Sequence, residues 1–315
     1  MSTMSKALLI TGATGHQGGA VIEALLDKHR NEFTLLAVTR DASSASAQRL
    51  ASKSPSIKLV QGNLDDVPAL FEEARRVNNN QTIWGVYSVQ VSLGPGVTVE
   101  GEVAQGKALV DGALTAGVKH FVYSSVERGG DKASWDNPTP IPHFQSKHQI
   151  EHHLRSAAST SSTDMGWTIL RPVAFMDNLA PGFQTKVFLA ALRNYLGDTT
   201  KPLQWIATDD IGVFAAKAFA NPSEWDGRAI GLAGDELTIE EMSRAFARVT
   251  GSPAPITYSF FGSALTYAVK EMGLMIGWFA SDGYKADIEA RRKDYPGLLT
   301  FEQWLAQKSP FAPKN

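Results

Sequence analysis

Gly12-Ala13-Thr14-Gly15-His16-Gln17-Gly18 is the stretch that decides the fold of this chain of 315 residues. It follows the apolar run Ala7-Leu8-Leu9-Ile10-Thr11 and precedes residues 19–26, whose apolar spacing predicts an amphipathic helix. The first glycine permits a tight turn, the second lets the backbone approach a pyrophosphate, and the third lets the helix pack closely on the strand. The helix N-terminus adds N–H donors and a partial positive charge for phosphates. The stretch therefore predicts a dinucleotide site, with a purely structural strand–turn–helix unit as the alternative.

Length and composition limit the classes of protein that need to be considered. The hydrophobic fraction of 43% is enough for one large or two small domains, and the net charge of -2 gives no reason to expect nucleic acid or an anionic membrane as a partner. The absence of cysteine from the sequence excludes disulfides, thiolate catalysis and cysteine-based zinc sites. The longest apolar run, near residues 272–280, is short and contains glycines, and residues 1–6 carry no apolar signal segment. We therefore expect a cytoplasmic protein.

The first half of the chain alternates strand and helix patterns, which predicts an α/β fold with a doubly wound parallel sheet. Helices on both faces would cover this sheet, and ligands would bind at the carboxyl ends of its strands. Strands are predicted at residues 7–11, 33–39, 57–60, 83–89, 119–125 and 167–170, and helices at 67–77 and 99–116, the latter ending at Gly117.

The pattern loosens after Pro172, which predicts a smaller lobe over the carboxyl edge of the sheet. Residues 1–172 would form the nucleotide-binding core and residues 173–315 mainly the substrate lobe, with residues 203–220 returning to the core. Thr238-Ile239-Glu240-Glu241 has the spacing of a capping box that begins a helix. Short strands are expected at 229–233 and 256–260, and loops at 41–56 and 128–142, with a Ser/Thr-rich stretch at 156–163.

The end of the second strand selects the nucleotide. An NAD site places a carboxylate there for the ribose 2′-hydroxyl, whereas a 2′-phosphate requires a cation. Here the strand ends in Thr39-Arg40, and a guanidinium binds phosphate through two parallel charge-assisted hydrogen bonds. This pattern favours NADP(H). The alternative is that Arg40 is an ordinary surface residue and Asp41 binds the ribose; Asn63 and Asp65 could bind the adenine edge.

With these residues identified, the chain resembles the NmrA-like family of atypical short-chain dehydrogenases over nearly its whole length. The resemblance implies a Rossmann fold, NADP(H) binding and a C-terminal substrate lobe, and it is compatible with either a reductase or a nucleotide-sensing regulator. Besides the glycine stretch, the motifs that carry it are Thr39-Arg40, Gly62-Asn63-Leu64-Asp65, Gly85-Val86-Tyr87-Ser88-Val89, His143-Phe144-Gln145-Ser146-Lys147 with Ile150-Glu151, Leu170-Arg171-Pro172-Val173-Ala174-Phe175-Met176-Asp177-Asn178, and Asp209-Asp210-Ile211-Gly212. The residues expected to bind the cofactor are Gly12, Thr14, Gly15, His16, Gln17, Gly18, Arg40, Asn63, Leu64, Ser88, Gln90, Lys147 and Pro172.

The chain departs from ordinary short-chain dehydrogenases in lacking their Tyr-x-x-x-Lys pair. Lys147 fits the lysine position, and four residues before it stands His143, whose imidazole can shuttle protons near neutral pH. The alternative for His143 is a histidine at the end of a loop, and the alternative for Lys147 is a solvated helix lysine paired with Glu151. Ser125 closes the fifth strand, with Ser124, where a substrate oxygen could be held or local backbone groups satisfied. The candidate catalytic residues are Lys147, His143 and Ser125.

Two further patterns carry less weight. His148 and His152 have the i,i+4 spacing of a metal chelate and His153 adjoins them, but no third ligand is suggested, so we expect a solvated helix face and no metal. The segment 90–96 could cover the cofactor, although its glycines could equally form a simple turn.

Two functions compete. One is an enzyme that transfers hydride from NADPH to a C=O, C=N or activated C=C bond of a small organic molecule. The other is a catalytically silent NADP(H) sensor that acts through protein partners and distinguishes the redox forms of the nucleotide. The aromatic C-terminal part is rich enough to line an apolar pocket and favours the enzyme. The aromatic residues considered for this role are Trp278, Phe279, Tyr284, Trp304 and Phe311.

Overall fold

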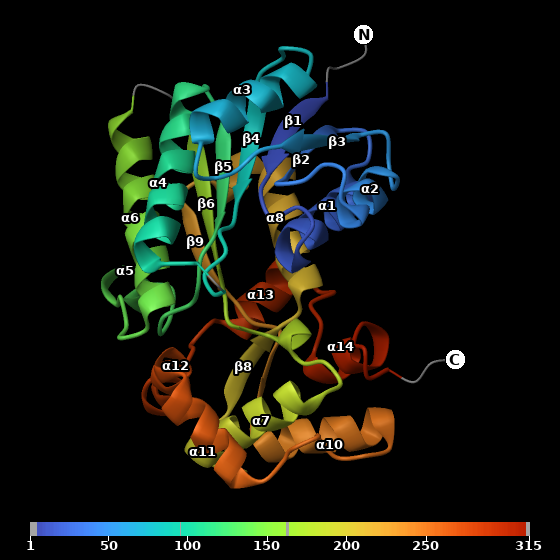
Figure 1. The fold of residues 1–315 in the computed structure, drawn as a ribbon, viewed down its shortest axis with the longest axis vertical. Helices are drawn as coiled ribbons and strands as arrows, with labels where there is room; N and C mark the ends of the chain where they lie inside the picture. Colours follow the sequence, from blue (N-terminus) through green and yellow to red (C-terminus); the bar gives the residue numbers. More distant parts are fainter. Residues whose placement is uncertain (1–4, 95, 162–163, 313–315) are drawn as a thin grey trace. The chain divides into compact units, whose positions relative to one another are not determined.

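The computed structural model describes residues 5–94, 96–161 and 164–312. Its main feature is a seven-stranded sheet in the order β3-β2-β1-β4-β5-β6-β9 (Figure 1). Neighbouring strands from β3 to β6 pair in parallel, which confirms the predicted doubly wound α/β class. The strands are β1 (Lys6–Ile10), β2 (Phe33–Thr39), β3 (Ile57–Gln61), β4 (Ile83–Ser88), β5 (His120–Ser124), β6 (Gly166–Pro172) and β9 (Arg228–Leu232).

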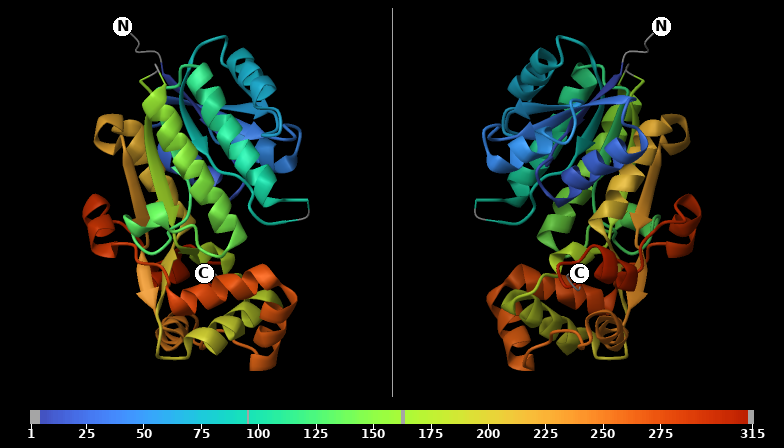
Figure 2. Two further views of the ribbon diagram at one scale, coloured as in Figure 1. Left: turned by 90° about the vertical axis from the view of Figure 1, so that its left-hand side faces the viewer. Right: turned by 90° about the vertical axis from the view of Figure 1, so that its right-hand side faces the viewer.

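Helices cover both faces of this sheet (Figure 2). On one face α4 packs closely on both of its neighbours, at two glycines that leave no room for a side chain. A Cβ on Gly106 would lie 2.4 Å from Cδ1 of Ile150 in α6, and a Cβ on Gly112 would lie 2.7 Å from Cγ1 of Val67 in α3. On the other face Gly212 of α8 approaches the backbone of α1 in the same way. These helices are α1 (His16–Lys28), α2 (Ala45–Ala51), α3 (Val67–Val77), α4 (Val99–Thr115), α6 (Pro142–Thr160), α8 (Thr208–Ala220) and α9 (Pro222–Trp225).

The first strand and helix are joined as the glycine stretch predicts. Gly12 has a φ of +60°, which a residue with a side chain rarely adopts. A Cβ on Gly18 would lie 2.3 Å from the carbonyl oxygen of Gly12, so α1 can pack on the turn only because this residue has no side chain. Gly15 is the N-cap of α1 with a φ of −95°, so its role is to leave space and not to supply a left-handed conformation.

A second group of elements is built around a three-stranded sheet in the order β10-β8-β7. The predicted capping box is present: Thr238 Oγ1 accepts from the backbone of Glu241, and the Glu241 carboxylate accepts from the backbone of Thr238. The elements are α5 (Ala133–Asp136), β7 (Ala174–Phe175), the 3₁₀ helix η1 (Met176–Asn178), α7 (Phe183–Leu196), β8 (Leu203–Ile206), β10 (Asp235–Leu237), α10 (Ile239–Thr250), α11 (Ser259–Ala268), α12 (Lys270–Ser281), α13 (Ile288–Asp294) and α14 (Phe301–Gln307).

The chain divides into two compact units, and it crosses between them several times. The first unit comprises Met1–Ser125, Ser146–Leu170 and Ile211–Ala229, and the second comprises Val126–Gln145, Arg171–Asp210 and Ile230–Asn315. This division differs from a single boundary at residue 172, because residues 126–145 belong to the second unit. Of the segment expected to return to the core, β8 stays in the second unit, while α8 from Ile211 onward lies in the first.

Three local expectations were wrong. Residues 256–260 were expected to form a strand, but α11 begins at Ser259, because the apolar residues there continue at helical spacing. The expected loop 41–56 contains α2, whose N-cap Ser44 accepts from the backbone N–H of Ala47. The expected loop 128–142 contains the short α5. The Ser/Thr-rich stretch at 156–163 is helical as far as Thr160, and residues 162–163 lie outside the described part.

Among the helices of the described residues, none has the length and hydropathy that crossing a bilayer requires.

Candidate functional site

The first unit contains a cavity of about 880 Å³ where the carboxyl ends of β1, β2, β3 and β4 meet. Its walls are the glycine turn, the segments that follow β2 and β3, the loop after β4 and the first turns of α4. This is the edge at which doubly wound sheets bind ligands. Of the residues predicted to bind a cofactor, the lining includes Gly12, Thr14, Gly15, Arg40, Asn63 and Leu64.

The glycine turn forms the part of the cavity that has the fewest side chains. Thr11 fixes its start: the Thr11 hydroxyl donates to the carbonyls of Tyr87 and Val89 at 3.1 and 3.0 Å, and the backbone N–H of Val89 donates to it at 2.8 Å. No side chain caps α1 at Gly15. The first N–H groups of α1 therefore remain available to an anion, together with the positive end of the helix dipole.

The end of β2 places a cation and an anion side by side on the cavity wall. Both Arg40 and Asp41 are exposed and line the cavity. The Asp41 carboxylate accepts from the backbone N–H and the hydroxyl of Ser43, at 2.8 and 2.6 Å, and these hydrogen bonds lower the pKa of Asp41. No described residue forms a hydrogen bond or an ion pair with the Arg40 guanidinium, which leaves it open to a ligand. Ser44 and Ser46 line the cavity beside it.

Beyond β3 the lining is a short polar network. Asn63 Nδ2 donates to Asp65 Oδ2 at 2.7 Å, and Gln105 Nε2 of α4 donates to Asp65 Oδ1 at 2.7 Å. These two hydrogen bonds lower the pKa of Asp65. The expectation that Asn63 and Asp65 bind the adenine edge stays a prediction, and the structure adds Gln105 to the same wall.

Several residues predicted to bind the cofactor are not among the described residues that line this cavity: His16, Gln17, Gly18, Ser88, Gln90 and Lys147. Gln17 Oε1 accepts from the hydroxyl of Ser124 at 2.5 Å, so this side chain links α1 to β5. Ser88 is buried and accepts from Gln90 Nε2 at 2.9 Å. Gln90 Oε1 is also buried, and no described residue donates to it. Pro172 ends β6 and belongs to the second unit.

Lys147 is buried and is paired, but not with Glu151. Its Nζ donates to Oε1 of Glu102 in α4 at 2.8 Å. The same carboxylate accepts from the hydroxyl of Ser92 at 2.9 Å and from the hydroxyl of Ser146 at 2.6 Å. We call these four residues the Glu102 cluster. Glu102 is a cavity-lining residue that the sequence reasoning missed, because no local spacing connects it with Lys147.

His143 lies in the first turn of α6 and not at the end of a loop. Within the second unit its Nδ1 lies 2.5 Å from Oε1 of Glu271, and its backbone N–H donates to the same oxygen at 3.2 Å. A carboxylate on Nδ1 fixes the orientation of the imidazole ring. Ser125 is buried at the end of β5, and its backbone N–H donates to the carbonyl of Leu170 at 2.7 Å.

Comparison with known proteins identifies the family. The model of the NmrA-like family matches residues 4–305. The chain belongs to the NmrA-like family. The oxidoreductase lnaB of Aspergillus flavus, which contains an NmrA-like domain, is 28% identical over 95% of this chain and 93% of its own length. The oxidoreductase notA' of Aspergillus versicolor, which also contains an NmrA-like domain, is 31% identical over 78% of this chain and 69% of its own length.

Solved structures show the same fold at lower identity. Triphenylmethane reductase from Citrobacter sp., complexed with NADP(H), superposes with a TM-score of 0.71 at 18% identity and covers 96% of this chain and 99% of its own. The NADPH-dependent quinone oxidoreductase QOR2 from Escherichia coli, complexed with NADPH, has a TM-score of 0.67 at 20% identity and covers 94% and 96%. Both likenesses support the Rossmann-type fold of this NmrA-like chain.

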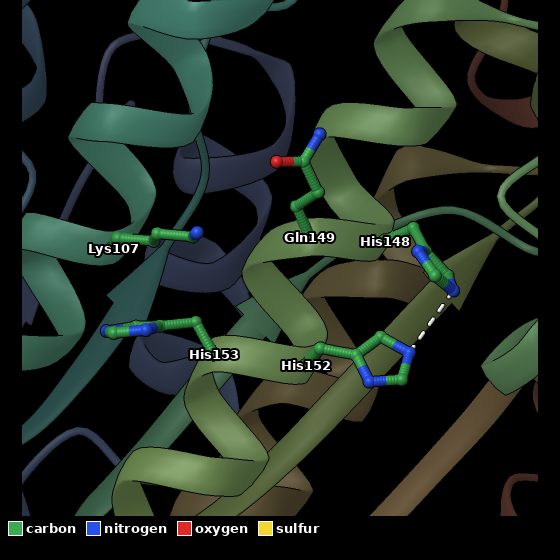
Figure 3. A pocket seen from close by; sticks show the side chains of 5 residues that line it. All are labelled: Lys107, His148, Gln149, His152 and His153. Carbon is green, nitrogen blue, oxygen red and sulfur yellow. Dashed lines mark hydrogen bonds between the residues drawn. The ribbon is translucent and has the colours of Figure 1, made fainter.

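A second, smaller cavity of about 410 Å³ in this NmrA-like chain lies over α6 and includes the histidines noted in the sequence (Figure 3). Nε2 of His148 and Nε2 of His152 are 3.1 Å apart, and His153 Nε2 lies 2.7 Å from Oδ1 of Asp111 in α4. The described residues contain no group of three or more side chains that could hold a metal ion. Two imidazoles fall short of the three or four protein ligands that zinc sites use.

Proposed function

We propose that this protein is an NADP(H)-dependent oxidoreductase that transfers a hydride to a C=O, C=N or activated C=C bond of a small organic molecule. The observation that carries this proposal is the cavity of the first unit, where the uncapped start of α1 and the open guanidinium of Arg40 occur in one wall. The names of the relatives and the NADP(H) in the structural neighbours support the same reaction class.

The residues present fit a dinucleotide that carries a 2′-phosphate. Gly12 and Gly15 leave the turn without side chains, so a pyrophosphate would meet the first N–H groups of α1. Arg40, with the hydroxyls of Ser44 and Ser46 beside it, would hold the 2′-phosphate. The hydrogen bonds from Ser43 lower the pKa of Asp41, so its carboxylate stays charged and would repel this phosphate, and the Arg40 guanidinium has to outweigh that repulsion.

When bound, the nicotinamide supplies the hydride, and the chain's own residues have to hold the ribose and deliver the proton. Lys147 would donate to ribose hydroxyls with the N–H groups that it does not give to Glu102. His143 would donate a proton from Nε2, with Glu271 holding its Nδ1, in the way that a carboxylate orients a catalytic histidine. Ser125 would hold a substrate oxygen.

The second unit exposes aromatic side chains that suit an apolar substrate. Tyr258 and Phe260 are exposed. The ring centroids of Phe260 and Phe261 are 4.0 Å apart, and Phe183 of α7 packs edge-to-face on Phe261 with a centroid distance of 5.1 Å. An exposed cluster of this kind is typical of a ligand or partner surface. By contrast, four of the five aromatic residues noted in the sequence pack in the interior of the unit: Trp278, Phe279, Tyr284 and Trp304.

The same exposed aromatic cluster also supports the second candidate function, an NADP(H)-binding sensor that acts through protein partners. Such a sensor would bind NADPH and NADP⁺ with different affinities and would not turn over. The two functions are distinguished by measuring NADPH and NADP⁺ affinities by fluorescence titration and then NADPH oxidation with quinones, imines and conjugated enones. Oxidation of NADPH that depends on the added acceptor supports the enzyme, whereas tight binding without oxidation of any acceptor supports the sensor. Failure to bind either nucleotide contradicts both.

A further inference from the structure

A buried carboxylate that the sequence did not single out lies in the wall of the nucleotide cavity. The side chain of Glu102 is 1% exposed, and it has three donors: Lys147, Ser92 and Ser146. A carboxylate removed from water is costly unless hydrogen bonds and an opposite charge replace its hydration. Glu102 has hydrogen bonds from two hydroxyls and the opposite charge of Lys147, so its surroundings replace the water that a carboxylate loses on burial.

The packing of two helices brings Glu102 and Lys147 together. Glu102 and Gly106 are four residues apart on α4, and Lys147 and Ile150 are three residues apart on α6, so each pair lies on one face of its helix. A Cβ on Gly106 would lie only 2.4 Å from Cδ1 of Ile150, so α4 and α6 approach closely at this turn. The close approach lets the side chains of Glu102 and Lys147 meet one turn away, where the Lys147 side chain is 11% exposed.

The third donor to Glu102 comes from the loop after β4. Ser92 belongs to residues 89–94, here called the β4 loop, from which Val89, Val91, Leu93 and Gly94 line the cavity. The β4 loop is therefore joined to α6 through a single carboxylate. Its apolar residues Val91 and Leu93 are exposed, although valine and leucine favour buried positions.

We propose that Glu102 is the positioning residue of the cofactor site: its carboxylate holds the Lys147 ammonium beside the cavity and ties it, through Ser92, to the β4 loop. The lysine and the loop then act on a bound nucleotide as one unit. This inference rests on the proposed function, since it takes the cavity to bind NADP(H). It assigns to Glu102 a role that acts through Lys147 and not on the substrate itself.

The ionisable groups around Lys147 determine how nucleotide affinity should respond to pH when Glu102 is replaced. Glu102 of α4 is the carboxylate that pairs with its ammonium. On α6 itself His143 and Glu151 stand one turn before and after it. Asp65, which also lines the cavity, accepts from Gln105 of α4 and from Asn63. Removing the charge of Glu102 leaves a buried ammonium without its counterion, which favours the neutral amine. Nucleotide affinity should then depend on pH.

The test compares Glu102→Gln with Glu100→Gln, which removes the same charge from an exposed position in the same helix end. NADPH affinity is measured by fluorescence titration between about pH 7 and pH 9.5, where the wild type and Glu100→Gln should show a nearly constant affinity. In Glu102→Gln the affinity should fall by about tenfold across this range, the effect of one proton lost from the site. The Glu102→Gln/Lys147→Met double variant should lose that pH dependence, and Glu102→Asp should retain the wild-type profile.

A second readout does not need the nucleotide. Acylating reagents attack only the neutral amine, so mass spectrometry should find Lys147 labelled several-fold faster in Glu102→Gln than in Glu100→Gln. Hydrogen exchange of the β4 loop should also be faster in Glu102→Gln and in Ser92→Ala. If Glu102→Gln matches Glu100→Gln in pH profile, labelling and exchange, the inference is overturned while the proposed function stands. If the wild type does not bind NADPH, the proposed function fails, and labelling still decides whether Glu102 holds Lys147.

Discussion

The glycine turn and the Glu102 cluster both reach one cavity, the turn through Gly12 and Gly15 and the cluster through Glu102, and they are built on opposite physical principles. The turn works because side chains are missing: a Cβ on Gly18 would lie 2.3 Å from a carbonyl oxygen, and Gly12 has a left-handed φ. The Glu102 cluster works because buried side chains satisfy one another. A site formed by closely packed backbone tolerates almost no substitution. In a site formed by side chains, single substitutions can change one hydrogen bond or one charge at a time.

The largest effect is expected for Gly18→Val. The new Cβ would press on the backbone of Gly12 and Thr11, which cannot move aside as a flexible side chain can. The free energy of unfolding should fall by about 3 kcal/mol or more, measured by urea denaturation. Gly19→Ala on the same helix is the control, since its Cβ would meet Ala13 O at 3.6 Å and should raise stability by about 0.5–1 kcal/mol. Equal effects of the two changes would contradict the packing argument.

Gly15→Val should abolish nucleotide binding and leave a folded protein. Gly15 is exposed and has an ordinary φ of −95°, and a Cβ there would lie 3.3 Å from the carbonyl oxygen of Gly12. A side chain therefore requires only a small adjustment of the turn, but it would occupy the space of the pyrophosphate. We expect NADPH affinity to fall by about 100-fold or more, while the circular dichroism spectrum stays unchanged. Unchanged affinity would mean that the phosphates bind elsewhere.

His143→Phe tests the proton donor on the helix that also carries Lys147. Turnover should fall by about 100-fold, the usual contribution of one general acid, and the decline of the rate toward alkaline pH should disappear. The measurement is the rate of NADPH oxidation across pH with an acceptor found active in the wild type. His153→Phe is the control, because that histidine lies on the same helix and pairs with Asp111. A near-normal rate with the wild-type pH profile would exclude His143 as donor.

Arg40→Asp should reverse or abolish the preference for NADPH over NADH, because the guanidinium is the open cation of the wall and a second carboxylate would repel the 2′-phosphate. We expect the ratio of the two affinities to change by about tenfold or more, measured by parallel titrations. Arg49→Asp makes the same charge change on exposed α2 and should leave the ratio unaltered. Equal affinities for the two nucleotides in the wild type would refute the assignment of Arg40.

The smallest effect is expected for Gly106→Ala in the contact beneath the Glu102 cluster. Its Cβ would lie 2.4, 2.7 and 3.0 Å from Cδ1, Cγ1 and Cγ2 of Ile150. Because these are side-chain and not backbone atoms, the cost should be limited to about 1–2 kcal/mol in the free energy of unfolding. Gly106→Ala/Ile150→Val should recover part of this loss, because the smaller side chain restores the space. If Gly106→Ala is neutral alone, α4 and α6 do not depend on this glycine for their approach.

The elements predicted most accurately are those whose signals lie within a few residues. The strand at 33–39 and the helix at 67–77 are found at the predicted bounds, and the capping box at Thr238 is present. The strand predicted at 256–260 failed, since a short apolar run does not distinguish a strand from the start of a helix. The short α2 was missed because Ser44, its N-cap, stands among other serines that are equally typical of a loop.

The sequence by itself determined the strand–turn–helix unit, the alternating order of the elements and the cation that follows the second strand. These depend on residues that are neighbours in the chain, so spacing and side-chain chemistry are sufficient to recognise them. Only the tertiary structure decided the partners of the reactive side chains: Lys147 pairs with Glu102, 45 residues away, and His143 with Glu271, 128 residues away. Local spacing had suggested Glu151 for Lys147. Helix packing selected Glu102 instead, because the glycine contact of Gly106 with Ile150 lets a carboxylate of α4 reach a lysine of α6.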